Sequence, residues 1–258
     1  DIIQLLPLND TGLETSPYSA ISAFALNPIH LGLAELPFAL SHKNLKLRIE
    51  KMQELNQLKR CNYKAVRELK DAFLKEYYAL YGKKKIESEE FQSFKQEHPW
   101  LKPYALYKTL RITHDWKSFE DFPHNLKNPT ILIYQELLIT YKDEIDFHCF
   151  VQYLCFNQFE GVKKFANSQN VFLMGDIPIL INRDSADVWM QRNLFNLNYA
   201  AGAPPDMYAD GQNWGFPIYN WEEMENEDYE WWKLRLKVAE KLYDIYRIDH
   251  IIGFFRIW

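Results

Sequence analysis

Apolar residues recur at helical spacing through much of the first part of the chain. In the segment 43–81 they lie mostly three or four positions apart, which predicts an amphipathic helix. We expect a break near Cys61 and Asn62 that folds this segment into a hairpin, with its Lys and Glu residues on the solvated face. Further helices are predicted at 87–97, at 103–114 and at 130–167, with a loop bounded by Pro123 and Pro129.

The pattern changes to that of buried strands near residue 171. The segment VFLMGDIPILI, residues 171–181, is a continuous apolar run of the kind found in a parallel strand covered on both faces. Shorter strand-like segments stand at 2–8 and at 243–249, and a Gly- and Pro-containing loop follows the first of them.

The segments between the last two strands complete an alternating order. We expect a long polar and aromatic loop at 182–220 and then a helix at 222–242, with one stripe formed by Trp231, Leu234, Val238 and Leu242. Helix, strand, loop, helix and strand is the order of a parallel sheet or barrel. The predicted fold class is therefore α/β, of the (β/α)8 TIM-barrel type. The helical block from 43 to about 150 is then an insertion between barrel strands.

Composition narrows the class of partners. The chain has 258 residues, of which 47% are hydrophobic, so it can bury a substantial core. Its net charge of −5 and pI of about 5.8 argue against binding to nucleic acid. No apolar run reaches the length that spans a membrane, and the chain opens on a strand-like segment without a signal peptide.

The cysteines and the missing motifs argue against redox or metal chemistry. Cys61, Cys149 and Cys155 share no metal-ligand spacing, and we expect small buried thiols in a reducing, cytoplasmic compartment. The sequence contains no GxGxxG, GxxxxGK, HExxH or GxSxG, so no cofactor and no metal is expected. Surface or hydrogen-bonded side chains are expected for His30, His42, His98, His114, His124 and His148.

The last strand carries charged residues where a packed core needs none. In YRIDH, Arg247 and Asp249 point to the same side of the strand, and His250 to the other. At the carboxyl end of a barrel strand, such side chains open into the active-site mouth. The guanidinium of Arg247 favours the ionised form of the Asp249 carboxylate, which is the form a nucleophile needs. A buried structural ion pair is the alternative, and the strand end and His250 favour the functional interpretation.

Other segments contain further candidate site residues. Asp176 follows Gly175 in GDIP and is expected either to hold sugar hydroxyls or to cap the next turn, while Gly175 allows close approach of backbone or ligand. The segment GQNWGFPIYNW, residues 211–221, sets aromatic faces beside amide groups. Such a loop suits pyranose rings, and a hydrophobic loop packed on the barrel is the alternative. SPYS places Tyr18 in the loop after the first strand.

Together these segments resemble a known family. The chain resembles the amylomaltases, the 4-alpha-glucanotransferases of glycoside hydrolase family 77. The resemblance rests on six segments that occur in this order: LPLNDTG, SPYSAISAFALNP, GDIPI, DSADVW, AGAPPDMYADGQNWGFPIYNW and YRIDHIIGF. The resemblance implies a (β/α)8 barrel with helical insertions. It also implies action on alpha-1,4-glucans and maltooligosaccharides by a retaining double displacement.

The resemblance assigns roles to individual residues. Asp249 matches the catalytic nucleophile of the family. The substrate-binding positions match Tyr18 near the catalytic subsite, Asp176 as a sugar-binding aspartate, Trp214 on the loop over the acceptor side, and Arg247 and His250 beside the nucleophile.

The sequence departs from the family pattern in three ways. Phe216 stands where the family has Asn in WGNP, and Ile251 and Ile252 follow RIDH where Phe-Arg is usual. The general acid/base Glu and the transition-state-stabilising Asp of the family match no residue here. We expect both beyond residue 258, so the chain alone is expected to be inactive and to need the C-terminal remainder of the same polypeptide.

The resemblance also divides the chain. Residues 1–42 hold the first barrel strand and an active-site loop, 43–150 a helical insertion subdomain, and 151–258 the barrel βα units that end in the nucleophile strand. The alternatives to a glucanotransferase are an alpha-glucan hydrolase, a non-catalytic glucan-binding protein, and a structural half-barrel held by a partner chain.

Overall fold

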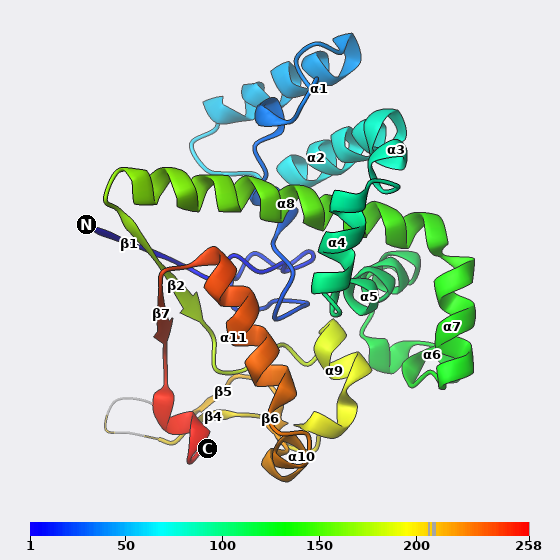
Figure 1. The fold of residues 1–258 in the computed structure, drawn as a ribbon. Coiled ribbons are helices and arrows are strands. Elements are labelled where there is room, and N and C mark those ends of the chain that lie inside the picture. Colours follow the sequence, from blue (N-terminus) through cyan, green and yellow to red (C-terminus); the bar gives the residue numbers. More distant parts are fainter. Residues whose placement is uncertain (206, 208–209, 258) are drawn as a thin grey trace.

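A three-stranded parallel sheet forms one end of the molecule. The computed structural model describes residues 1–205, 207 and 210–257. Its central strand is β2 (Phe172–Ile177), flanked by β1 (Ile2–Leu5) and β7 (Ile245–Ile248), in the order β1-β2-β7 (Figure 1). The long connections between these strands are mainly helical, as parallel strands require. All three predicted strands therefore form, each shorter than the apolar run that predicted it.

Two long helices complete the βα units. Helix α8 (Lys142–Ser168) leads into β2 and packs against it, and α11 (Glu230–Leu242) leads into β7 and packs against α8 (Figure 1). The contacting faces are apolar, with Leu173 of β2 and Val238 and Leu242 of α11 all buried. Burial of these faces is the main force that fixes both helices on the sheet.

The sheet exposes apolar side chains, and its outer strands have free edges. β1 and β7 each pair with β2, and neither has a second neighbouring strand within the described ranges. Ile2 is 57% exposed, Ile3 49% and Phe172 49%. Parallel strands are usually covered on both faces, so this sheet has the character of one sector of a larger barrel.

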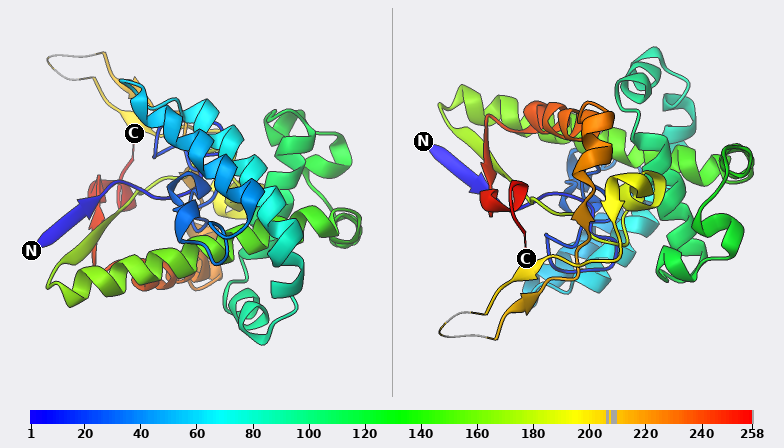
Figure 2. Two further views of the ribbon diagram at one scale, coloured as in Figure 1. Left: turned by 90° about the horizontal axis from the view of Figure 1, so that it is seen from above. Right: turned by 90° about the horizontal axis from the view of Figure 1, so that it is seen from below.

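The helical block is a series of short elements around α8. It comprises α1 (Lys43–Gln53), α2 (Tyr63–Tyr77), α3 (Lys83–Lys85), α4 (Glu89–Glu97), α5 (Leu101–Thr113), α6 (His124–Lys127) and α7 (Ile131–Thr140). Both views in Figure 2 show α6 and α7 at the end of the molecule opposite the strands. The expected boundary between residues 150 and 151 falls inside α8, so the block and the sheet share one continuous helix.

The predicted helical hairpin at 43–81 forms with its break in the expected place. α1 ends at Gln53, a single turn of 3-10 helix follows, and α2 begins after Asn62. The side chain of Asn62 accepts a hydrogen bond from the backbone N–H of Ala65, which is the usual way to satisfy a free donor at a helix start.

Two predicted helices are each divided in two. The segment 130–167 forms α7 and α8, with a break at Tyr141. The sequence pattern did not predict this break, because the apolar spacing fits a helix on both sides of it. The segment 222–242 forms α10 (Trp221–Asn226) and α11, because Asp228 and Tyr229 adopt left-handed backbone conformations. The expected loop between Pro123 and Pro129 contains the short helix α6.

The predicted long loop at 182–220 is partly ordered by small elements. Helix α9 (Ala186–Met190) begins after Ser185, whose hydroxyl accepts from Val188 N. Further along lie two small antiparallel pairs, β3 (Phe195–Asn196) with β6 (Ile218–Tyr219) and β4 (Gly202–Ala203) with β5 (Gln212–Asn213). The prediction of a loop was therefore wrong in part, since two-residue strands leave no periodic signal.

The cysteines differ in exposure. Cys149 and Cys155 are buried in α8, as expected, whereas Cys61 is exposed because it lies in the solvated connection between α1 and α2. Across the described residues, we find no helix with the length and apolar character needed to cross a membrane.

Burial of His148 predicts a loss of stability in acid. Burial lowers the pKa of this α8 histidine well below its ordinary value of 6.5, and the positive charges of Lys108 and Lys75 lower it further. The unfolded chain takes up a proton near pH 6.5 while the folded chain does not, so this stability is present above pH 6.5 and is lost as the pH falls. We expect His148→Phe to reduce the slope of unfolding free energy against pH by up to about 1.4 kcal/mol per pH unit.

Urea unfolding between pH 8 and pH 5 measures this slope. Wild type and variant are expected to differ by a constant amount above pH 7 and to converge below it. Parallel curves over the whole range would contradict the assignment.

Candidate active site

One guanidinium joins two carboxylates at the ends of neighbouring strands. Asp176 of β2 lies directly opposite Arg247 of β7 in the parallel register. Arg247 donates from Nη1 to Asp176 Oδ2 at 3.0 Å, and its Nη2 lies 3.1 Å from Oδ1 of Asp249. The predicted same-side arrangement of Arg247 and Asp249 is therefore present, and Asp176 lies on that side too.

The two carboxylates differ sharply in exposure. The side chain of Asp249 is 62% exposed, whereas that of Asp176 has an exposed fraction of 0%. Asp249 follows the last residue of β7, Ile248, so the strand end brings it to the surface. Of this pair, Asp249 is the group that a ligand can reach in this conformation.

Tyr18 completes the contacts of Asp176. It lies in the turn that follows β1, and its hydroxyl donates to Asp176 Oδ2 at 2.9 Å. The pKa of Tyr18 is raised by burial first, and then by its hydrogen bond to Asp176 and that carboxylate's charge. The pKa of Arg247 is raised by Asp176 and, to a lesser degree, by Asp249. The tyrosine is therefore neutral and the arginine charged at neutral pH.

His250 meets Trp214 on the other side of the chain end. The ring centroids lie 5.1 Å apart with an interplanar angle of 83°, an edge-to-face contact. Trp214 follows β5, and its Nε1 donates to Gln212 Oε1 at 2.9 Å. His250 has φ 51° and ψ 44°, a left-handed conformation that costs a non-glycine residue about 1–2 kcal/mol. Strained backbone of this kind is concentrated at functional sites.

All six residues singled out from the sequence thus meet in one place. Tyr18, Asp176, Arg247 and Asp249 form a chain of polar contacts, and the peptide bond between Asp249 and His250 links them to the aromatic pair. Among the described residues, no group of three or more His, Cys, Asp or Glu side chains is placed to hold a metal ion.

The glycine before Asp176 accommodates a side chain of the protein itself. A Cβ on Gly175 would lie 2.3 Å from Cδ2 of Tyr243, whose ring fills the space beside the strand. The close approach expected at Gly175 is therefore made by a buried aromatic ring.

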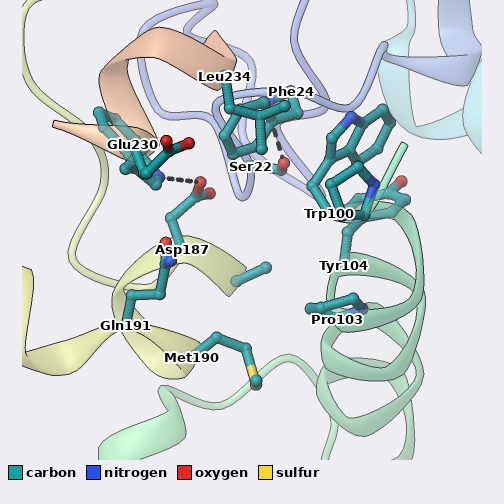
Figure 3. Close-up of a pocket in the computed structure, with 13 residues that line it drawn as sticks. Ser22, Phe24, Trp100, Pro103, Tyr104, Asp187, Met190, Gln191, Glu230 and Leu234 are labelled. Atoms are coloured by element: carbon teal, nitrogen blue, oxygen red, sulfur yellow. Dashed lines mark hydrogen bonds between the residues drawn. The ribbon is translucent and has the colours of Figure 1, made fainter. Parts of the chain in front are cut away.

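The motif DSADVW contains a further aspartate, Asp187, to which the sequence alone assigns no role. It is buried at a cavity of about 220 Å³ lined also by Phe24, Trp100 and Glu230 (Figure 3). Asp187 accepts hydrogen bonds from Trp231 Nε1 and Ala23 N, each at 3.0 Å, and burial raises its pKa. Its contacts tie α9 to α11 and to the loop after β1, so it supports the elements that carry the site.

The sequence of the chain matches one family of known proteins. Over residues 1–258 it matches the family model described as 4-alpha-glucanotransferase. The chain belongs to this family. The resemblance inferred from the motifs is thereby confirmed.

Relatives extend the comparison. The chain is 42% identical to a 4-alpha-glucanotransferase of Chlamydia caviae over 100% of its own length and 49% of that protein. The chain thus spans about half the length of the curated relatives it matches first.

Solved structures confirm the predicted TIM-barrel type of fold. The amylomaltase from Streptococcus agalactiae in complex with acarbose superimposes with a TM-score of 0.86 and 27% identity, over 98% of this chain and 52% of that one. The amylomaltase from Corynebacterium glutamicum gives a TM-score of 0.80 at 23% identity, over 100% of this chain and 36% of that one.

The contact between Gly175 and Tyr243 predicts that alanine is destabilising at position 175 but not at position 161. Gly175→Ala is expected to cost about 1–3 kcal/mol of unfolding free energy, because the new methyl group would overlap the Tyr243 ring. Gly161→Ala in α8 is the matched control, since its Cβ meets no atom within 4 Å. That change is expected to stabilise the helix by up to about 1 kcal/mol.

Urea unfolding of the two variants tests this pair. A Gly175→Ala protein as stable as wild type would show that the Tyr243 ring does not occupy this space.

Proposed function

We propose that this chain forms the nucleophile side of a 4-alpha-glucanotransferase active site. The reaction moves a segment of a 1,4-alpha-glucan to the 4-OH of an acceptor glucan or glucose by a retaining double displacement. The observation that carries the proposal is the exposed Asp249 carboxylate held by Arg247, which the buried Asp176 anchors in turn. Membership of the family and the relatives' names support it.

In the first displacement, a carboxylate oxygen of Asp249 attacks the anomeric carbon of the donor. The bond from that carbon to the glycosidic oxygen breaks through an oxocarbenium-like transition state, and a glycosyl ester forms on Asp249. Arg247 holds Oδ1, so we assign the attack to Oδ2. The departing oxygen takes a proton from a second carboxyl group, which lies about 5–5.5 Å from the nucleophile in retaining enzymes.

In the second displacement, the 4-OH of the acceptor attacks the ester carbon. Its proton passes to the second carboxyl group, the ester bond breaks, and Asp249 regains its charge. No residue of 1–258 is assigned this acid/base role. Because the relatives are about twice as long as this chain, we propose that a further segment supplies it and pairs with the exposed edges of β1 and β7.

Asp176 is proposed to act on the substrate through its neighbours. Its buried Oδ2 accepts from both Tyr18 and Arg247, so it fixes the positions of a hydroxyl and a guanidinium beside the reacting sugar. A direct bond from a sugar to Oδ2 of Asp176 would need one of these two groups to move aside.

Trp214 and His250 are proposed to line the acceptor side. An aromatic face there favours the apolar face of a pyranose and excludes water, so the glycosyl ester meets a sugar hydroxyl first. In a hydrolase, water would reach the glycosyl ester.

We also propose a cytoplasmic location. All three cysteines are free, and the thiol of Cys61 is exposed, as suits a reducing compartment.

Replacement of the nucleophile tests the proposal. In the full-length polypeptide that carries this chain, Asp249→Asn is expected to slow redistribution of maltotriose into longer oligosaccharides by on the order of 10⁴-fold or more. Chromatography of the products measures the rate. Asp228→Asn, which changes an exposed acid paired with Lys233, is the control and is expected to act like wild type.

Covalent trapping identifies the residue directly. A 5-fluoro-glucosyl fluoride needs no acid to expel its anomeric fluoride, so it is expected to add one 5-fluoroglucosyl group to the peptide that contains Asp249. Mass spectrometry locates the adduct. An adduct on another residue, or normal transfer by Asp249→Asn, would contradict the proposed function.

The role of Trp214 predicts a change in product ratio. Trp214→Ala is expected to raise hydrolysis relative to transfer about tenfold, the equivalent of about 1.4 kcal/mol. Trp214→Phe keeps an aromatic face and is expected to stay near wild type. Release of free glucose equivalents against redistributed oligosaccharides gives the ratio, and an unchanged ratio in Trp214→Ala would refute the water-excluding role.

A further inference from the structure

A buried arginine lies behind the candidate site. Arg235 is 5% exposed and shares the apolar stripe of α11 with Trp231 and Val238. Its guanidinium lies 5.3 Å from the ring centroid of Trp231 and 4.9 Å from that of Trp232. These ring faces attract its charge, and the Tyr219 hydroxyl and the Asp187 carboxylate also lie near it, yet Nη1 is buried and has no partner at normal hydrogen-bond geometry among the described residues.

Asp176 has a buried oxygen that lacks a hydrogen-bond donor in the part of the chain that the structure describes. Its Oδ2 accepts from Tyr18 and Arg247, whereas its Oδ1 is buried and has no partner within the described chain. A buried donor without an acceptor and a buried acceptor without a donor are both costly, so two such atoms in neighbouring charged residues call for a common explanation.

Both residues line the same small cavity. It has a volume of about 20 Å³, lies between the end of β2 and the side of α11, and is also lined by Asn9. A water molecule needs a cavity of at least about 10–15 Å³ and two to four polar partners. This cavity has room for one water molecule, and the residues that line it include an arginine, an aspartate and an asparagine.

We propose that Arg235 is a positioning residue of the active site, which holds Oδ1 of Asp176 through one buried water molecule. Arg235 donates to the water oxygen, and the water donates to Asp176. Oδ2 is thereby left for Tyr18 and Arg247, and Arg247 in turn holds Asp249. Arg235 touches neither Asp249 nor the substrate, so it acts on the reaction only through this chain of contacts.

The inference rests on the proposed function and extends it. The site then depends on two arginines, one on each side of Asp176. Arg247 on β7 faces the substrate, and Arg235 on α11 lies in the protein interior. The second arginine links the position of the nucleophile to the packing of a helix that carries no catalytic residue.

Two substitutions separate a positioning role from a packing role. Arg235→Met keeps most of the apolar volume and removes charge and donors, and Arg235→Lys keeps a charged donor. In the full-length protein, we expect Arg235→Met to lower kcat about 10- to 100-fold with KM changed less than about threefold. Arg235→Lys is expected to recover most of that loss. A packing role predicts the opposite order, with Met tolerated better than Lys.

Arg111→Met is the matched control. Arg111 is also a buried arginine, but its guanidinium contacts the Tyr107 hydroxyl and the main-chain oxygens of Asp184 and Trp116. Its replacement is expected to lower stability in urea and to leave kcat per folded molecule unchanged. Equal losses of kcat in Arg111→Met and Arg235→Met would overturn the inference.

A crystal structure of the wild-type full-length protein tests the water directly. Density for one water molecule within hydrogen-bond distance of Asp176 Oδ1 and Arg235 Nη1 is expected. A dry cavity, or a direct contact between the two side chains, would overturn the proposal even if no Arg235 variant folds.

Failure of the inference differs from failure of the proposed function. Absence of transfer by wild type, or a trapped adduct away from Asp249, counts against the function. Normal trapping at Asp249 together with a wild-type kcat in Arg235→Met counts against Arg235 alone.

Discussion

The site depends on a guanidinium that contacts two carboxylates in different environments. Arg247 lies between Asp176, which is fully buried, and Asp249, which is largely exposed. The buried contact fixes the arginine, since a charged group without its partner in the interior is strongly disfavoured. The exposed contact then orients a carboxylate that solvent and substrate can reach. A rigid interior pair thereby positions a reactive surface group.

The rest of the structure keeps this pair in register. The parallel pairing of β2 with β7 sets Asp176 opposite Arg247, and the Tyr243 ring against Gly175 fills the space beside the strand. Helix α8 packs against β2, and α11 packs against α8, so the two helices support the strands that they lead into. Beyond β7, the left-handed backbone of His250 turns its ring toward Trp214. Strain at one residue thus brings an aromatic loop beside the candidate nucleophile.

The large features were predictable from the sequence because each has a local signal. Apolar runs marked the three strands, and helical spacing marked the hairpin at 43–81 and the helix that leads into β7. The ordered motifs identified the family, and strand ends with charged residues indicated the site. Features without a periodic signal were missed, among them the break at Tyr141, the two-residue strands between 195 and 219, and the exposure of Cys61.

The family, the class of fold and the six candidate site residues could be read from the amino-acid order, because motif order and side-chain alternation are properties of neighbouring positions. Which of these residues touch depends on the packing of the folded chain. Asp176 lies 158 positions from Tyr18 and 71 from Arg247, and such distant pairs meet only through packing. The same holds for Arg235. Its position on an amphipathic helix indicates that it lies near the core, but the cavity that it shares with Asp176 forms only when α11 packs near β2.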